Sequence, residues 1–322
     1  MGPDRQPVFR GTAPALVTPF TPGGAVDEPA FRQLLDRVIE GSATPDGTAT
    51  AHHAGVHHAG VEAVVVMGTT GENPTVTPDE RQRLVELAVE HVAGRVPVVV
   101  GSGTNDTAQS VRFSRAAADA GADGLLVVSP YYNKPTPEGL VAHVSAIADA
   151  TDCPIVFYNV PGRTGQNVRA ETQLALADAV GTVVGTKEAS GDLNQIADIL
   201  AGRPAGFAVY AGDDDLAFPT VCLGADGLIS VAANAVPGAV SEMVRLALAG
   251  DVAGARGLHF LLLRAMRASF AEASPTPVKA VLAAMGLMDA RVRLPLVPLT
   301  PAAHALVMDA YGPFVEAAMA RA

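Results

Sequence analysis

Short apolar runs alternate with amphipathic segments along most of this chain. The apolar runs are rich in valine and do not alternate with polar residues, which is typical of strands covered on both faces. They predict strands at 13–18, 61–67, 96–100, 124–129, 154–158, 182–187, 207–211 and 227–231. The segments between them carry apolar residues at helical spacing. They predict helices at 28–40, 79–91, 107–120, 137–150, 170–179, 192–201, 215–223 and 237–249.

Strand-then-helix units that recur at intervals of about 20–35 residues are typical of a (β/α)8 TIM barrel. We therefore expect an α/β protein whose barrel, carrying the active site, spans residues 8–250. A doubly wound open sheet is the alternative, but no Gly-x-Gly-x-x-Gly follows the first strand. Residues 251–322 have a helical pattern broken by prolines at 275–277 and at 295. They predict a C-terminal helical extension.

Composition narrows the class of protein. Hydrophobic residues make up 49% of the 322 residues and charged residues 17%, which suits a large core. A formal charge of −11 argues against nucleic acid and anionic membranes as partners. Cys153 and Cys222 are too few for a disulfide framework, and we expect both to be core thiols. With no signal-peptide pattern and no long apolar run, we expect a soluble cytoplasmic protein.

Polar motifs fall where the predicted strands end, and those ends meet at one mouth of a barrel. They are Thr69, Thr70, Tyr131, Tyr132, Tyr158, Lys187 and Gly212. Lys187 follows a short apolar run, and burial disfavours the charged form of its amine. A neutral amine attacks carbonyl groups and forms a Schiff base. Lys187 could instead reach out to solvent or pair with Glu188, but the convergence of polar motifs favours a nucleophile.

These motifs resemble those of the dihydrodipicolinate synthase family, within the pyruvate-dependent class I aldolases that include N-acetylneuraminate lyase. The resemblance covers the chain from about residue 9 to its end. The matching segments are Gly68-Thr69-Thr70-Gly71-Glu72, Pro130-Tyr131-Tyr132-Asn133, Tyr158-Asn159-Val160-Pro161-Gly162-Arg163-Thr164, Lys187-Glu188-Ala189-Ser190-Gly191, Gly212-Asp213-Asp214, Gly227-Leu228-Ile229-Ser230 and Pro277-Val278-Lys279.

The resemblance implies a lyase that needs no metal and no cofactor beyond a covalent imine between Lys187 and pyruvate. It implies that Tyr158 moves protons through Thr69 and Tyr132. In the family this last tyrosine comes from a neighbouring subunit, so we expect a homo-oligomer, either a dimer or a tetramer. Hydroxyl groups in series suit a reaction in which each step shifts a proton.

Further residues are implied to bind substrates. Thr70 and the backbone of Ile229 would hold the pyruvate carboxylate, and Gly212 also belongs to the substrate site. Arg163 offers a planar fork for the carboxylate of L-aspartate 4-semialdehyde. The implied product is 4-hydroxy-tetrahydrodipicolinate, in lysine and diaminopimelate biosynthesis.

Other functions stay open from the sequence alone. A sister lyase or aldolase acting on a sugar acid, N-acetylneuraminate or 2-keto-3-deoxygluconate, would keep Lys187 and Tyr158 but not normally Arg163. A hydratase-aldolase would need a more apolar mouth. A non-catalytic barrel that serves as a binding module would not need the nucleophile and its proton relay.

Three features depart from the family or invite a second interpretation. Residues 41–60 form a long insert with a tandem His-His-Ala-Gly-Val repeat, which we interpret as a surface loop rather than a metal site. We expect the acidic run 213–215 to cap the following helix rather than bind metal. Where lysine-sensitive relatives bind lysine, Asn105 and Tyr131 match, but Pro78, Arg81 and Gln109 do not. We therefore do not expect tight inhibition by lysine.

Overall fold

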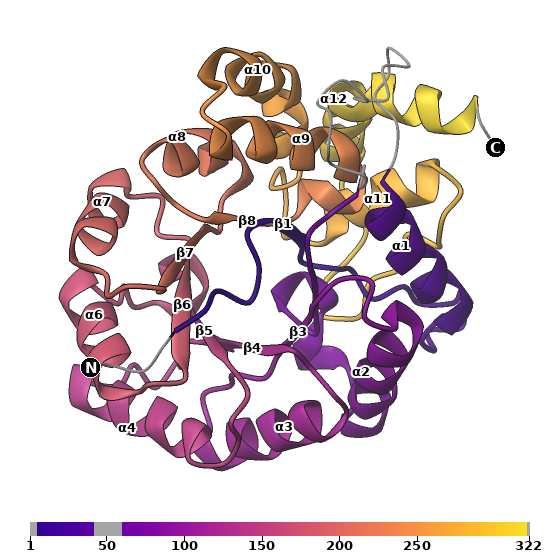
Figure 1. Ribbon diagram of the computed structural model, residues 1–322. Coiled ribbons are helices and arrows are strands. Elements are labelled where there is room, and N and C mark those ends of the chain that lie inside the picture. The colour runs from indigo at the N-terminus through magenta and orange to yellow at the C-terminus, as the bar shows by residue number, and fades with distance from the viewer. Residues whose placement is uncertain (1–4, 42–59, 321–322) are drawn as a thin grey trace.

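In the computed structural model, which describes residues 5–41 and 60–320, eight parallel strands form one curved sheet (Figure 1). The order is β1-β8-β7-β6-β5-β4-β3-β2, and a bridge between Ala15 and Val65 joins the first strand to the second. The sheet therefore closes into the predicted barrel. The strands are β1 (Gly11–Pro14), β2 (Val64–Val66), β3 (Val98–Gly101), β4 (Gly124–Val128), β5 (Ile155–Asn159), β6 (Val183–Glu188), β7 (Ala208–Ala211) and β8 (Gly227–Ser230).

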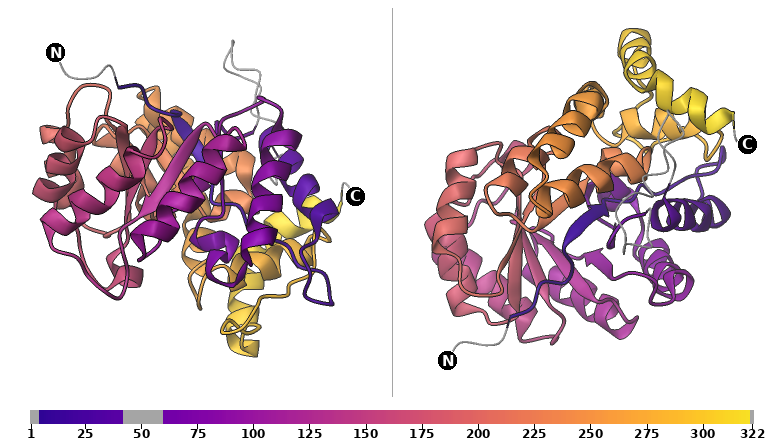
Figure 2. Two further views of the ribbon diagram at one scale, coloured as in Figure 1. Left: turned by 90° about the horizontal axis from the view of Figure 1, so that it is seen from below. Right: turned by 45° about the horizontal axis from the view of Figure 1, so that its top comes forward.

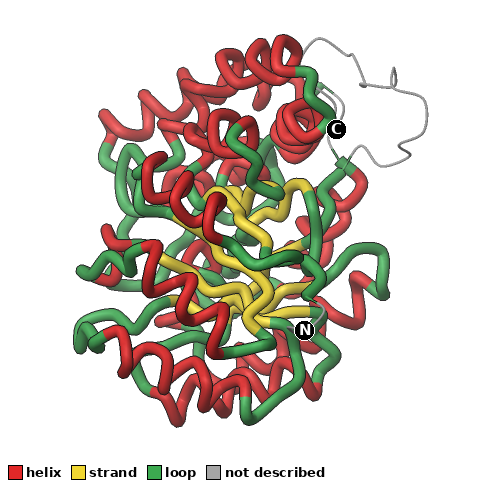
Figure 3. Tube along the Cα trace, turned by 60° about the vertical axis from the view of Figure 1, so that its left-hand side comes forward, coloured by secondary structure: helices red, strands yellow, loops and turns green. Residues whose placement is uncertain are grey.

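Helices surround the strands on the outside, as the red ring around the yellow centre in Figure 3 shows. They are α1 (Glu28–Glu40), α2 (Pro78–Val92), α3 (Thr107–Asp119), α4 (Pro137–Ala148), α6 (Ala170–Ala179), α7 (Leu193–Gly202), α8 (Ala217–Cys222) and α9 (Pro237–Leu248). A one-turn helix, α5 (Pro161–Thr164), was not predicted. Among the described residues no helix combines the length and the apolar character needed to cross a bilayer.

Local capping explains why the helices were predicted better than the strands. α1 begins where predicted because the Asp27 side chain accepts a hydrogen bond from the Ala30 amide. Thr77 and Glu80 form the reciprocal capping box of α2. The first strand was predicted at 13–18 but lies at Gly11–Pro14, because Gly11 and Thr12 pair with β8 although neither is apolar.

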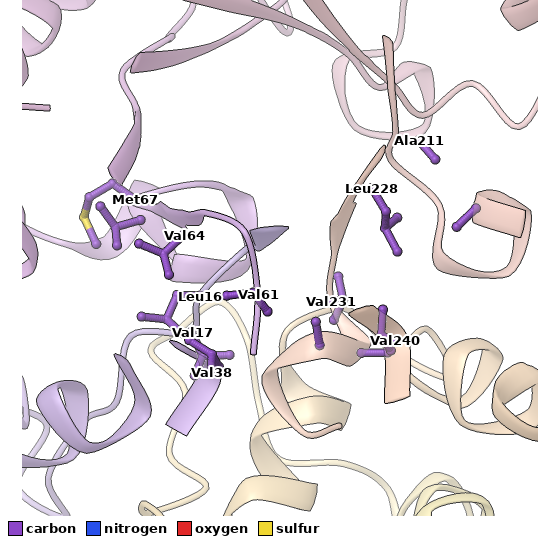
Figure 4. Close-up of a cluster of buried hydrophobic side chains, with 14 of the residues drawn as sticks. Leu16, Val17, Val38, Val61, Val64, Met67, Ala211, Leu228, Val231 and Val240 are labelled. Atoms are coloured by element: carbon purple, nitrogen blue, oxygen red, sulfur yellow. The ribbon is translucent and has the colours of Figure 1, made fainter. Parts of the chain in front are cut away.

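Two layers of apolar side chains form the core. The outer layer fills the space between strands and helices. Val17, Val38 of α1, Val231 and Val240 of α9 all belong to this layer and are labelled in Figure 4. The inner layer fills the barrel with residues such as Val65, Val156 and Ile229. Burial of each valine or leucine contributes about 1.5–3 kcal/mol, so the two layers hold the strand ends at fixed positions.

Three more helices follow the barrel: α10 (Val252–Ala268), α11 (Thr276–Ala284) and α12 (Pro301–Met319). Figure 2 shows these orange and yellow helices gathered on one side of the barrel. The predicted breaks are confirmed at Pro275 and Pro295, which both lie between helices, whereas Pro277 lies in the first turn of α11. Pro313 nevertheless lies inside α12. The division of the chain at residue 250 stays a prediction.

Candidate active site

Lys187 and Tyr158 lie side by side inside the mouth of the barrel. They are directly opposite each other in the pairing of β5 with β6, and each residue is 5% exposed. The Lys187 Nζ lies 4.3 Å from the centre of the Tyr158 ring. Tyr158 belongs to the inner core layer, so the amine points into the barrel and not to the solvent outside. A buried amine next to a phenol is suited to attack on a carbonyl with proton transfer close at hand.

Glu188 does not pair with Lys187. Successive strand residues point to opposite faces, so its carboxylate lies on the outer face of the barrel. There it accepts hydrogen bonds of 3.0 Å from Asn159 and 2.6 Å from Gln173. Both alternatives that the sequence left open for Lys187, pairing with Glu188 and exposure to solvent, are therefore wrong.

The ends of β7 and β8 complete this side of the mouth. Ile229 lies in the inner core layer, and Gly212 follows β7 directly. The Gly212 amide donates a 2.8 Å hydrogen bond to the Glu188 carbonyl. A Cβ atom at Gly212 would lie 2.5 Å from the Ala189 side chain, so only glycine allows these two loops to approach each other.

The two predicted threonines lie on a single turn of 3-10 helix, Thr69–Gly71, immediately beyond β2. Thr69 shares a small cavity with Tyr158, whereas Thr70 is buried. Glu72 ends this turn in the left-handed region, at φ 53°, and its side chain points into the protein. The loop is thus fixed by a buried residue that the sequence did not single out for a role.

Tyr132 lies in the loop after β4 and, unlike Lys187 and Tyr158, is exposed to solvent. The residue is 89% exposed, and its φ of 72° is unusual for a residue other than glycine. The neighbouring Asn133 side chain donates a 2.8 Å hydrogen bond to the Asn105 carbonyl and holds the loop in place. An aromatic side chain held out in this way is available for contact with a second molecule.

Arg163 lies on α5, just beyond the end of β5. Its Nη2 donates a 3.4 Å hydrogen bond to the Ser274 carbonyl, and the side chain is otherwise exposed at the mouth. Val160 to Gly165 form a compact turn, in which the Arg163 and Thr164 amides donate to the Val160 carbonyl. The segment Asn159-Val160-Pro161-Gly162 therefore leads into a one-turn helix that carries Arg163.

The acidic run after β7 does not cap a helix, so that prediction was wrong. Asp214 is buried, and its carboxylate accepts hydrogen bonds from the Ser230 hydroxyl and the Val231 amide. It therefore ties the end of β7 to the end of β8. The predicted helix is split into a 3-10 turn, Asp214–Leu216, and α8, with no side-chain cap on either.

Asp213 was also assigned the wrong role. Burial raises the pKa of its carboxyl group to about 6, and the Lys187 ammonium opposes this rise. Asp214, Asp215 and Glu188 raise the pKa further by repulsion between like charges. A carboxyl group with a pKa of about 6 that interacts with the Lys187 charge can exchange protons in the neutral range.

A second cavity, of about 390 Å³, lies where the resemblance places a lysine site. Pro78, Arg81, Gln109 and Tyr131 all line it. The Arg81 guanidinium lies 4.2 Å from the Phe113 ring centre and donates to the Gly101 carbonyl. Burial lowers the pKa of Arg81 to about 10, so it remains a cation at neutral pH. A cation at this wall opposes the ammonium of a bound lysine.

The structure also tests the predictions for the two cysteines. Cys153 is buried as expected, but Cys222 is exposed, so the prediction for that thiol was wrong. The repeat spans residues 52–61, of which only Gly60 and Val61 lie among the described residues. Within residues 5–41 and 60–320, no cluster of three His, Cys, Asp or Glu side chains is arranged to hold a metal ion.

Comparison with known proteins agrees with this geometry. The model of the dihydrodipicolinate synthetase family matches residues 8–311. The 4-hydroxy-tetrahydrodipicolinate synthase of Salinibacter ruber is 55% identical over 91% of each chain. The crystal structure of dihydrodipicolinate synthase from Thermotoga maritima is 40% identical, with a TM-score of 0.88 over 96% of this chain and 99% of that one.

The chloride-inhibited enzyme from Acinetobacter baumannii, solved in complex with pyruvate, is 36% identical. It has a TM-score of 0.87 over 95% of this chain and 98% of its own. Sequence and structure thus match over nearly the whole length of all three relatives. The chain belongs to the dihydrodipicolinate synthetase family.

Proposed function

We propose that this enzyme is a 4-hydroxy-tetrahydrodipicolinate synthase that joins pyruvate to L-aspartate 4-semialdehyde through an imine on Lys187. The observation that carries the proposal is the Lys187 amine, buried in the barrel mouth 4.3 Å from the Tyr158 ring centre, in a member of this family. Because Lys187 supplies the covalent link, the proposed chemistry draws on no other cofactor.

In the first step the Lys187 nitrogen attacks the keto carbon of pyruvate. The carbonyl oxygen takes up protons and leaves as water, and a C=N bond remains. Loss of a proton from the methyl group then gives an enamine carbon, which attacks the aldehyde carbon of the second substrate. The aldehyde oxygen takes a proton and becomes a hydroxyl. The amino group of the semialdehyde then attacks the imine carbon, closes the ring and displaces the Lys187 amine.

Each of these steps needs a proton donor or acceptor near the Lys187 nitrogen. We assign this role to Tyr158, with Thr69 as the next member of the relay, because both line the same cavity. Tyr132 is assigned as the last member, supplied by a neighbouring subunit, because the residue is 89% exposed in its own chain. The enzyme would then act as a homo-oligomer.

The remaining assignments concern the two substrate carboxylates. Thr70 and the Ile229 backbone would hold pyruvate, since Thr70 lies on the turn just beyond β2 and Ile229 lies in β8 within the inner core layer, and Gly212 would leave room for the bound substrate. Arg163 would hold the semialdehyde carboxylate, since its guanidinium lies exposed at the mouth. We also propose a cytoplasmic location, in keeping with two cysteines that are free thiols.

One experiment tests this proposal. The enzyme is incubated with pyruvate, reduced with borohydride, digested and analysed by mass spectrometry. We expect one pyruvate-derived adduct on the peptide that contains Lys187, and none in Lys187→Arg. An adduct on Lys134 or Lys279 would show that the assignment is wrong. Turnover with L-aspartate 4-semialdehyde, compared with N-acetylneuraminate and 2-keto-3-deoxygluconate, then separates the synthase from a sugar-acid lyase.

A further inference from the structure

A buried carboxylate, Glu188, lies directly behind the nucleophile and has no part in the chemistry described above. Its side chain is on the outer face of the barrel, and the residue is 1% exposed. Four groups donate hydrogen bonds to it: Asn159 at the end of β5, Gln173 in α6, Gln195 in α7 and the Ser190 amide. The carboxylate therefore joins two strands, two helices and its own loop.

All of these donors are neutral. A buried carboxylate without a cation has a large desolvation cost, which well-packed apolar residues at the same place would avoid. Here hydrogen bonds of 2.6–3.1 Å replace the lost hydration. Directional bonds fix positions more tightly than apolar packing, and this points to a requirement for exact placement of the strand end.

The pairing of β5 with β6 needs such a restraint. Ile155 pairs with Val183, but Val156 pairs with Gly185, so Val184 is an extra residue in β6. A shift of one residue would turn every following side chain to the opposite face of the sheet. Lys187 comes three residues after this irregularity, and a shift there would remove its amine from the barrel.

The Glu188 cluster holds the strand in the required register on the outer face. Its bond to Asn159 joins the residues that follow Lys187 and Tyr158 in the two strands. Thr186, on the other side of Lys187, donates a 2.7 Å hydrogen bond to Gln173, which in turn donates to Glu188. Both neighbours of the nucleophile are thus held from behind.

We propose that Glu188 is a positioning residue, which holds Lys187 against Tyr158 by fixing the end of β6 to the end of β5. The proposal rests on the function given above, in which Lys187 is the nucleophile. Misplacement of a reacting group by about 1 Å can cost a factor of 100 in rate. Loss of the cluster should therefore slow imine formation and turnover more than it weakens the binding of pyruvate.

The test compares four variants with the wild-type enzyme. Glu188→Gln keeps the size of the side chain but turns an N–H group towards the donors. We expect kcat and the rate of trapping with pyruvate and cyanoborohydride to fall about tenfold to a hundredfold, with a smaller change in the KM for pyruvate. In the double variant Glu188→Gln/Gln173→Glu, residue 188 becomes the donor and residue 173 the acceptor of the hydrogen bond between them. We expect kcat and the trapping rate to recover in part.

Glu62→Gln is the matched control. Glu62 precedes β2 at the opposite end of the barrel, where it accepts hydrogen bonds from Arg245 and the Thr12 amide. Its loss should lower the unfolding temperature but leave trapping at the wild-type rate. If Glu188→Gln does not fold, Gln195→Met removes only one donor, and trapping should slow by several fold.

Three outcomes overturn the proposal. The first is trapping in the folded Glu188 or Gln195 variant as fast as in Glu62→Gln. The second is a folded double variant without any recovery. The third is a wild-type enzyme that pyruvate does not modify at Lys187. Only this third outcome also refutes the proposed function, so the two failures can be told apart.

Discussion

Lys279 and Glu72 form an ion pair that is almost completely enclosed by protein. The Lys279 Nζ lies 2.6 Å from Glu72 Oε1, and the two side chains are 0% and 1% exposed. The amine also donates to the Thr18 carbonyl, and Arg293 donates its amide to the second oxygen of Glu72. Burial lowers the pKa of Lys279, and the Glu72 carboxylate opposes this fall. Helix α11 is thereby joined to the loop that carries Thr69 and Thr70.

Lys279→Met should lower the free energy of unfolding by about 3–5 kcal/mol, because it leaves the Glu72 carboxylate buried without its cation. The matched control is Arg264→Met, which breaks an ion pair with Asp309 whose side chains are 74% and 69% exposed. That change should cost less than about 1 kcal/mol. Urea titration measures both. Equal losses would mean that the buried pair contributes little.

The double variant Lys279→Met/Glu72→Met gives a second check on this ion pair. It removes both charges, so it should recover part of the stability that Lys279→Met loses. The KM for pyruvate should rise in the single variant, because the threonine loop is no longer fixed. If Lys279→Met is destabilised but its KM for pyruvate is unchanged, the ion pair stabilises the protein without fixing the threonine loop.

Asp213 predicts a dependence of stability on pH. Its pKa of about 6 in the folded protein is above the ordinary aspartate value of 3.8, so the folded state binds the proton more tightly than the unfolded state. The ionised carboxyl group therefore destabilises the protein above pH 6, and this effect disappears below about pH 4. Asp213→Asn should be more stable than the wild type by up to about 3 kcal/mol at pH 8.

Thermal unfolding at pH 4 and pH 8 checks this prediction. The gain of Asp213→Asn should be present at pH 8 and absent at pH 4. Asp309→Asn serves as a control, because that carboxylate is largely exposed and its change should not show the same dependence. A constant difference between Asp213→Asn and the wild type at all pH values would contradict the raised pKa.

Arg163 should matter for the aldehyde substrate and not for pyruvate. Arg163→Ala removes a charged hydrogen-bond donor, which should cost about 1.5–3 kcal/mol in kcat/KM for L-aspartate 4-semialdehyde, or roughly tenfold to a hundredfold. Arg163→Lys keeps the charge but loses the planar fork of the guanidinium. Its kcat/KM for this substrate should therefore lie between those of the wild type and Arg163→Ala. Arg169→Ala, a change at another exposed arginine nearby, is the control. If pyruvate trapping fails in Arg163→Ala as badly as turnover does, the arginine has a structural role.

The features that could be predicted from the sequence are those that depend on residues close together in the chain. Helix Glu28–Glu40 was predicted at its observed bounds, because its helical stripe of apolar residues lies within one segment. Lys187 and Tyr158 were placed together because both end strands of a barrel whose order is fixed. The motifs located the mouth, although they did not give its distances.

Residues that depend on distant partners were missed or misassigned. Asp214 was predicted to cap a helix, but its partner Ser230 lies 16 residues further along the chain. Glu72 and Lys279 are 207 residues apart, and nothing near either one indicates a buried pair. Glu188 was weighed as a partner of Lys187, because the sequence places them side by side while the strand turns them to opposite faces.

The final prediction concerns Tyr132, whose 89% exposure and φ of 72° suit a side chain that enters a second subunit. If it completes the proton relay of a neighbour, Tyr132→Phe and Lys187→Ala carry their defects in different parts of a shared site. A mixed dimer then holds one site with both defects and one with neither. Each mixed dimer should recover about half of the wild-type activity, and a random mixture about a quarter.

Co-refolding the two inactive variants, with mass spectrometry of the intact oligomers, measures this recovery. The control is a mixture of Tyr158→Phe with Lys187→Ala. Both residues lie in one chain and line the same mouth, so every site in that mixture keeps a defect and activity should stay absent. If Tyr132 acts within its own subunit, the first mixture behaves like the control. Inactive mixed oligomers of Tyr132→Phe and Lys187→Ala would therefore exclude a site shared between subunits.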